Sequence, residues 1–223
     1  MGDSDRRVEL ESALDRLIEA FGAGTWAEEV VRAKDEYATR TGRVFEDDEL
    51  FEARTAAFLE WYAVERPLAA PGLPPAALHR LAAPDDAEAM TAWLASHRSL
   101  YSIEDQGEHH VLLYDLIGGG LFEVDERRRL HGVADGDLLE ARLVGWQGKV
   151  RFGRTFLYHP AGARESIISH ARRVKESGGS RADIVDFVAS LRVRALRYKH
   201  VAAERVYEMG TSEFAKRGLG QHA

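Results

Sequence analysis

Residues 100–160 read LYSIEDQGEHHVLLYDLIGGGLFEVDERRRLHGVADGDLLEARLVGWQGKVRFGRTFLYHP, and this stretch decides the fold. Apolar and polar residues alternate in short runs, and turn-forming Gly and Asp residues separate one run from the next. In the run 138–144, for example, Leu139 and Leu143 fall on one face of a strand and Glu140 falls on the other. We therefore predict five short antiparallel strands that form a small barrel or a strongly curled sheet.

Helical periodicity dominates the chain on both sides of this stretch. Four of the six prolines lie between residues 67 and 75, which marks the best linker candidate. The pattern predicts an α+β protein in which flanking helices cover a barrel at about residues 99–158. The expected regions are an N-terminal helical region (1–66), a linker with covering helices (67–98), the barrel-like centre (99–160) and a C-terminal helical region (161–223).

The third expected helix, at about residues 47–65, begins with a run of acids, which the helix dipole favours, and carries an arginine on its apolar stripe. A short helix before the barrel is expected to end near His97. The last helix is expected to run unbroken from Ser180 to about Met209, with Gly210 ending it and a loose tail following. The stripe of the third helix consists of Phe51, Arg54, Thr55, Phe58, Leu59 and Tyr62.

The composition is ordinary for a globular protein, with 223 residues, of which 45% are hydrophobic and 30% are charged. The chain has no Cys, which excludes disulfides, thiol nucleophiles and cysteine-ligated metals. No apolar run approaches the roughly 18 residues of a membrane helix, and the N-terminus lacks the apolar core of a secretory signal. We therefore expect a cytoplasmic protein that contains no membrane span.

The net charge of −7 is distributed unevenly along the chain. Residues 1–66 hold 9 basic and 17 acidic residues, a balance of −8, whereas residues 164–205 hold 10 basic and 5 acidic residues, a balance of +5. This segregation favours docking of an acidic protein partner on the last helix, or else pairing of its basic residues with acids of the first three helices. The partner-binding candidates are Arg192, Arg194, Arg197, Lys199 and Arg205.

A second basic group lies in the barrel stretch and indicates an alternative function. Small barrels bind nucleic acids or nucleotides through a basic face with aromatic side chains that stack on bases. Two acids, Asp125 and Glu126, precede the arginine run, and the whole chain is acidic, which weighs against strong phosphate binding. The candidates for nucleic-acid binding are Arg127, Arg128, Arg129, Lys149, Arg151, Arg154 and Trp146.

No sequence motif for catalysis is present. The triple glycine at 118–120 joins two expected strands, so it predicts a hairpin turn and not a dinucleotide-binding loop. Adjacent His109 and His110 point to opposite faces of a strand, so they cannot both ligate one metal ion. A second alternative is a metal-dependent hydrolase with a site that is assembled by folding. In that site, one of these two histidines joins His131, His159, Asp115 or Glu123 as a metal ligand. The structural interpretation is that Asp115 and Asp137 are turn residues whose carboxylates accept hydrogen bonds from nearby backbone N–H groups.

Four pieces of the chain together resemble a known architecture: FLEWYAVERPL (58–68), SLYSI (99–103), LLYDLIGGGLFEV (112–124) and GDLLEARLV (136–144). They are similar to the helix-plus-barrel region of uncharacterised bacterial proteins, some of which also carry a SEC-C zinc motif. That motif requires clustered cysteines, so zinc binding does not carry over to this chain. The resemblance covers about residues 45–160 and implies an architecture without implying an activity.

The sequence thus favours a non-catalytic protein-interaction or regulatory adaptor module. The basis is segregated charge in a chain without a recognisable catalytic constellation, since charge segregation supports partner choice more than chemistry. No cofactor is predicted. An unnamed protein partner is expected, nucleic acid is the alternative partner, and the sequence assigns no oligomeric state.

Overall fold

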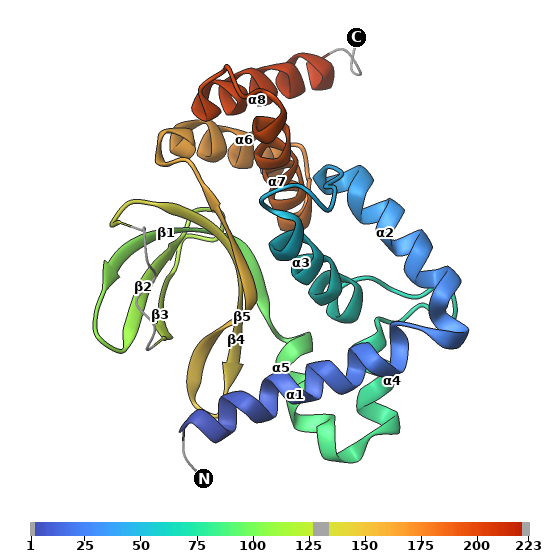
Figure 1. Cartoon of the computed structure of the whole chain (residues 1–223). Helices are drawn as coiled ribbons and strands as arrows, with labels where there is room; N and C mark the ends of the chain where they lie inside the picture. Colours follow the sequence, from blue (N-terminus) through green and yellow to red (C-terminus); the bar gives the residue numbers. More distant parts are fainter. Residues whose placement is uncertain (1–2, 127–133, 220–223) are drawn as a thin grey trace.

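The computed structural model describes residues 3–126 and 134–219 and has an α+β fold, which confirms the predicted class (Figure 1). Five strands close into a barrel, and helices from both ends of the chain flank it. The strands are β1 (His97–Gln106), β2 (His110–Asp115), β3 (Leu121–Asp125), β4 (Leu138–Trp146) and β5 (Lys149–His159). The helices are α1 (Asp3–Phe21), α2 (Ala27–Thr41), α3 (Phe51–Val64), α4 (Pro75–Ala82), α5 (Ala87–Leu94), α6 (Arg164–Glu176), α7 (Arg181–Arg197) and α8 (Ala203–Leu219).

The barrel has the strand order β1-β2-β3-β5-β4 and closes where β4 pairs with β1. The described pairings are antiparallel, as predicted, except at the seam between β3 and β5. That seam is parallel and rests on a single bridge between Val124 and Val150. A bulge between Ile103 and Asp105 of β1 bends the strand, and such a bend helps a short sheet to close.

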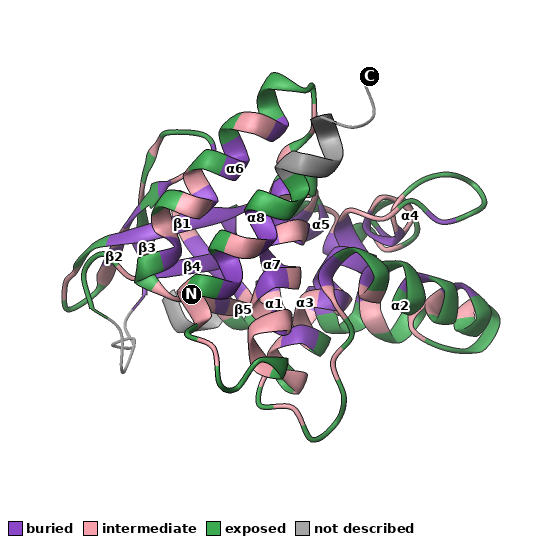
Figure 2. Ribbon diagram, turned by 90° about the horizontal axis from the view of Figure 1, so that it is seen from above, coloured by how far each residue is buried: buried purple, intermediate pink, exposed green. Residues whose placement is uncertain are grey.

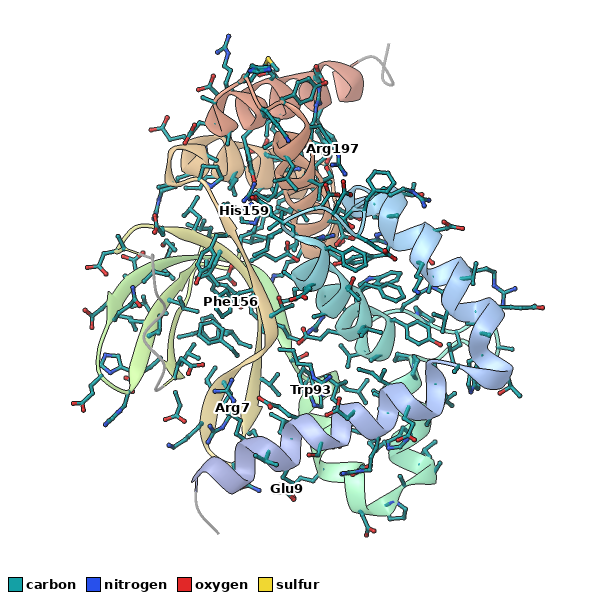
Figure 3. All side chains as sticks on the ribbon, in the orientation of Figure 1. Arg7, Glu9, Trp93, Phe156, His159 and Arg197 are labelled. Atoms are coloured by element: carbon teal, nitrogen blue, oxygen red, sulfur yellow. The ribbon has the colours of Figure 1, made fainter. Side chains whose placement is uncertain are left out.

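The barrel interior is apolar and aromatic. Leu139 and Leu143 lie inside, on the face that the sequence alternation predicts, together with Tyr101, Leu113 and Phe152. Figure 3 labels Phe156, a β5 side chain within the barrel that packs against Phe152 with ring centroids 5.4 Å apart. Side chains therefore fill the barrel, and its opposite, outward-facing positions are the ones left to meet the helices.

Helices cover the barrel from two directions. At one end, α1 and α5 pack against β4 through Leu14, Trp93 and Trp146, and the Trp93 indole donates a hydrogen bond to the Leu10 carbonyl (3.2 Å). On the other side, α3 lies against β5 and α7 lies against β1, with α2 outside them (Figure 1). Figure 2 shows that burial concentrates in the strands and on the inner sides of α3 and α7, whereas the outer side of α2 is exposed.

The predicted single last helix is wrong. The chain turns between Tyr198 and α8, and α8 folds back against α6 and α7. The turn buries Val206 and Tyr207, which are both 0% exposed, and that burial outweighs the local preference for one long helix. Gly210 does not end a helix: it lies within α8, where a Cβ would fall 2.3 Å from a Leu191 methyl carbon, so glycine allows the two helices to approach.

Two further boundaries differ from the prediction. The helix expected to reach His97 ends at Leu94, because His97 pairs with Leu143 at the start of β1. The helix expected from residue 47 begins at Phe51, and the preceding acids form a turn in which Asp48 accepts the Phe45 N–H (2.7 Å). Within the described residues, no helix is both long enough and apolar enough to span a membrane.

Candidate functional site

Charged side chains are buried where α3 covers the outer face of β4. Strand alternation turns Arg142 outward, and α3 places Glu60 and Glu65 opposite it. Arg142 is 3% exposed and bonds Glu60 (3.3 Å), Glu65 and the Ser96 hydroxyl (2.9 Å). Glu60 also accepts the backbone N–H of Arg154. The chain therefore provides every group that this guanidinium needs.

Arg98 of β1 extends the same arrangement to α7. Its guanidinium bonds Glu65 (3.0 Å), Glu140 (3.3 Å) and Asp186 (2.7 Å). Burial opposes the charge, but these three carboxylates outweigh it and raise the pKa of Arg98 above its ordinary value. We refer to these residues as the ion-pair cluster: Glu60, Glu65, Arg98, Glu140, Arg142 and Asp186.

Arg54 of α3 is buried beside the ion-pair cluster but takes part in none of its hydrogen bonds or ion pairs. It is 2% exposed, and none of its three guanidinium nitrogens has a hydrogen-bond partner within the described ranges. Its guanidinium carbon lies 4.9 Å from the ring centroid of Tyr37, whose buried hydroxyl likewise has no partner among described atoms. A guanidinium carries five N–H donors and keeps its charge in proteins, so leaving it buried and unpaired costs several kcal/mol.

Two cavities meet at Arg54. The inner one, of about 20 Å³, is lined by Arg54, Arg98, Glu140 and Arg142, and it has room for one water molecule beside the unpartnered Oε2 of Glu140. The outer one, of about 250 Å³, opens between the end of α2 and the start of α3, and we call it the α2–α3 pocket. Its walls include Tyr37, Val44, Phe51, Arg54, Thr55 and Phe58.

The mouth of the α2–α3 pocket is polar. Lys34 is exposed there, and Asp35 pairs with Arg43 at 3.0 Å, with both side chains more than half exposed. Apolar and aromatic walls with a buried cation at the floor are typical of a binding site for a small molecule.

Local backbone chemistry fixes the lip of this pocket, residues 42–50. Gly42 ends α2 with a φ of +87°, a conformation that favours glycine, and its N–H donates to the Ala38 carbonyl (3.0 Å). A Cβ at Gly42 would lie 3.0 Å from Val193 Cβ, so the lip rests directly on α7. Arg197 of α7, labelled in Figure 3, holds Asp48 of the lip at 2.5 Å.

The basic residues predicted to bind a partner are mostly engaged within the chain. The acids that they meet come from the lip and from α8, so the predicted pairing with the N-terminal third of the chain applies to Arg192 and Arg197 only. Lys199 is exposed. The four ion pairs are Arg192–Glu49 (3.3 Å), Arg194–Glu213 (3.1 Å), Arg197–Asp48 (2.5 Å) and Arg205–Glu208 (2.7 Å).

The four nucleic-acid candidates that the structure describes do not gather into an open basic face. Asp125 binds both Lys149 (2.9 Å) and Arg151 (3.0 Å), and Arg154 binds Asp15 of α1 at 2.6 Å. Trp146 is 3% exposed and packs in the core under α1 and α5, so its ring cannot stack on a base. Arg127, Arg128 and Arg129 lie outside the described residues.

The described residues contain no group of three His, Asp or Glu side chains that could hold a metal ion. Asp115 is a buried turn residue, as the structural interpretation predicts. Its carboxylate accepts hydrogen bonds from Ser99 (2.6 Å), His97 (2.9 Å) and the Ile117 N–H (2.9 Å). His159, labelled in Figure 3, bonds the Tyr207 hydroxyl (2.7 Å), and burial lowers the pKa of its imidazole to about 3. Neither residue is arranged for metal binding.

Sequence reasoning placed Arg54 on the apolar stripe of the third helix but did not single it out. The signal was an arginine among aromatic residues at helical spacing, which is uncommon because arginine is almost never fully buried without a partner. The chain matches no known protein-family model, no curated protein and no solved structure, so the α2–α3 pocket must be interpreted from its own chemistry.

Proposed function

We propose that this protein is a non-catalytic regulatory adaptor whose α2–α3 pocket binds a small organic anion. The observation that carries the proposal is the Arg54 guanidinium, which is 2% exposed at the floor of a pocket of about 250 Å³ and unpartnered within the described residues. An anion that enters the pocket supplies the hydrogen-bond acceptors that the protein does not.

The arrangement of α3 supports this assignment. Glu60 and Glu65, on the next turns of the same helix, satisfy Arg142, so the helix provides acceptors where a structural arginine needs them. Close to Arg54 the helix presents Phe51, Thr55 and Phe58 to the pocket instead. Those side chains suit the apolar body of a ligand and provide no anion.

The adaptor part of the proposal rests on the surface next to the pocket. Phe45 of the lip is 54% exposed, and the Arg197 guanidinium lies 5.1 Å from its ring centroid. Tyr198 is 43% exposed, and Arg194 lies over it in the same way (5.5 Å). Aromatic and arginine side chains are enriched at protein interfaces. Because the lip lines the pocket and also carries Phe45, pocket occupancy alters the surface that a partner meets.

Thermal unfolding in the presence of a library of small organic anions tests the binding function. Wild-type protein is compared with the variant Arg54→Met, which keeps an unbranched apolar stem and removes the guanidinium. An anion that raises the Tm of the wild type and leaves the variant unchanged supports the proposal. If no anion in the library discriminates the two proteins, the pocket does not serve this function.

A further inference from the structure

We infer that the ligand of the α2–α3 pocket is a monocarboxylate with a compact aromatic or branched apolar body. The inference rests on the proposed binding function and names its ligand class. It is drawn from the charge of the pocket, its hydrogen-bond donors and its size, and the residues that determine these properties are all described.

The charge of the site matches one negative charge. In the ion-pair cluster, Glu65, Glu140 and Asp186 surround Arg98, whereas Arg54 forms no ion pair among the residues described and interacts with Glu140 only at longer range. Arg43 at the mouth already pairs with Asp35. Lys34 lies at the exposed mouth, so Arg54 is the cation that meets the ligand at the buried floor. A carboxylate brings one negative charge to this floor, whereas a dianionic phosphate brings a second charge that must also lose its hydration.

The donors of the site also suit a carboxylate. The guanidinium forms a planar fork of N–H groups that binds the two oxygens of a carboxylate side by side. Tyr37 contributes a hydroxyl without a described partner, and burial raises the pKa of this phenol to about 12, so the hydroxyl stays protonated and can donate. Arg54 and Tyr37 thus offer the floor of the pocket hydrogen-bond donors that suit an anion.

The size and walls of the pocket define the rest of the ligand. The volume of about 250 Å³ exceeds the cavity of about 150 Å³ that holds benzene in an engineered protein, so one ring with a short carboxylate arm fits. Val44, Phe51 and Phe58 line the pocket above Arg54. These side chains contact carbon atoms favourably and leave polar substituents of the body without partners.

Matched probes test the ligand class by calorimetric titration. The probes are phenylacetate, its neutral amide phenylacetamide, benzylphosphonate and inorganic phosphate. Phenylacetate is expected to bind the wild type at least tenfold more tightly than the other three probes, because only this probe combines a planar carboxylate, which matches the guanidinium fork, with an apolar body. Tighter binding of benzylphosphonate overturns the carboxylate assignment and leaves anion binding at the pocket standing, whereas equal binding of the neutral amide overturns both.

Two variants distinguish binding at the pocket floor from a general effect of positive charge on affinity. Arg54→Met is expected to weaken phenylacetate binding by about 30-fold or more, since it removes the charged hydrogen bonds. Arg43→Met removes the same charge from the exposed mouth and is expected to weaken binding less than threefold. Equal losses in the two variants, or unchanged affinity in Arg54→Met, contradict the inference. If none of the four probes binds the wild type, both the ligand class and the proposed anion-binding function fail.

Discussion

Helix α3 borders two buried regions, and the buried arginines of these regions differ in their hydrogen bonding. In the ion-pair cluster, Arg142 bonds Glu60 of α3 and Glu65, which directly follows the helix. At the α2–α3 pocket, about two to three turns earlier along the chain, Arg54 has no hydrogen-bond partner among the described residues. Both guanidinium groups are at least 97% buried, so exposure to solvent does not explain the difference. From this difference we infer that the cluster stabilises the fold, and it supports the proposal that the pocket floor serves a group from outside the chain.

The largest expected effect is on the ion-pair cluster. Arg142→Met removes the partner of Glu60 and Glu65 and should lower the free energy of unfolding by about 3–5 kcal/mol, because it leaves buried carboxylates unpaired. Urea denaturation at neutral pH measures the change. The exposed variant Arg43→Met is the control, and it should stay close to the wild type. A loss below about 1 kcal/mol would show that the cluster is not structural.

His170 of α6 sharpens the comparison, because a histidine without partners can lose its charge and an arginine cannot. Both ring nitrogens of His170 lack a partner among described atoms, and the ring stacks on Phe187 (4.2 Å) and meets Phe214 (4.7 Å). Burial, followed by the nearby Arg173, lowers the pKa of this imidazole from 6.5 to about 4. The depressed value means that the stability it confers is present above pH 6.5 and is lost as pH falls toward 4.

The variant His170→Phe tests this linkage. Between pH 7 and pH 4 the wild type should lose on the order of 3 kcal/mol more stability than the variant, since the phenyl ring binds no proton. Urea midpoints at the two pH values provide the comparison, and the exposed His109→Ala serves as a control that keeps the wild-type loss. Parallel losses in wild type and His170→Phe would mean that the imidazole does not titrate as its surroundings require.

Arg54→Met is expected to have a smaller effect of opposite sign to Arg142→Met. Without added ligand, the free energy of unfolding should stay unchanged or rise by about 1–2 kcal/mol, because the substitution removes a buried guanidinium whose N–H groups have no hydrogen-bond partner among the described residues. Urea denaturation in a buffer free of carboxylates measures it. A loss as large as that of Arg142→Met would remove the distinction between the two regions and make Arg54 structural.

The smallest expected effect is at the surface ion pairs of α7. Arg194→Ala breaks the pair with Glu213 and should change stability by less than about 0.5 kcal/mol, since exposed pairs are screened by water. The same urea measurement applies. A larger loss would place Arg194 among the structural residues and remove it from the candidates for partner binding.

Much of the fold was predictable because short-range patterns determine it. Alternation located the strands and the inward faces of Leu139 and Leu143, and turn chemistry explained Asp115. The break after α7 was not predictable, because it depends on burying Tyr207 against elements distant in sequence. The pocket was not predicted: the stripe of the third helix included Arg54, but only the folded chain shows which acids reach it and which do not.

The contact between the lip and α7 has a consequence for synthesis. Arg40 at the end of α2 bonds Asp186 of α7, 146 residues later, and Gly42 rests on Val193. At a ribosomal rate of about 5–20 residues per second, roughly 7–30 seconds separate the emergence of these partners. The nascent chain therefore exposes α2 and α3 without their support for that interval. The proposed ligand of the finished pocket would therefore distinguish chains whose translation has passed α7 from shorter ones.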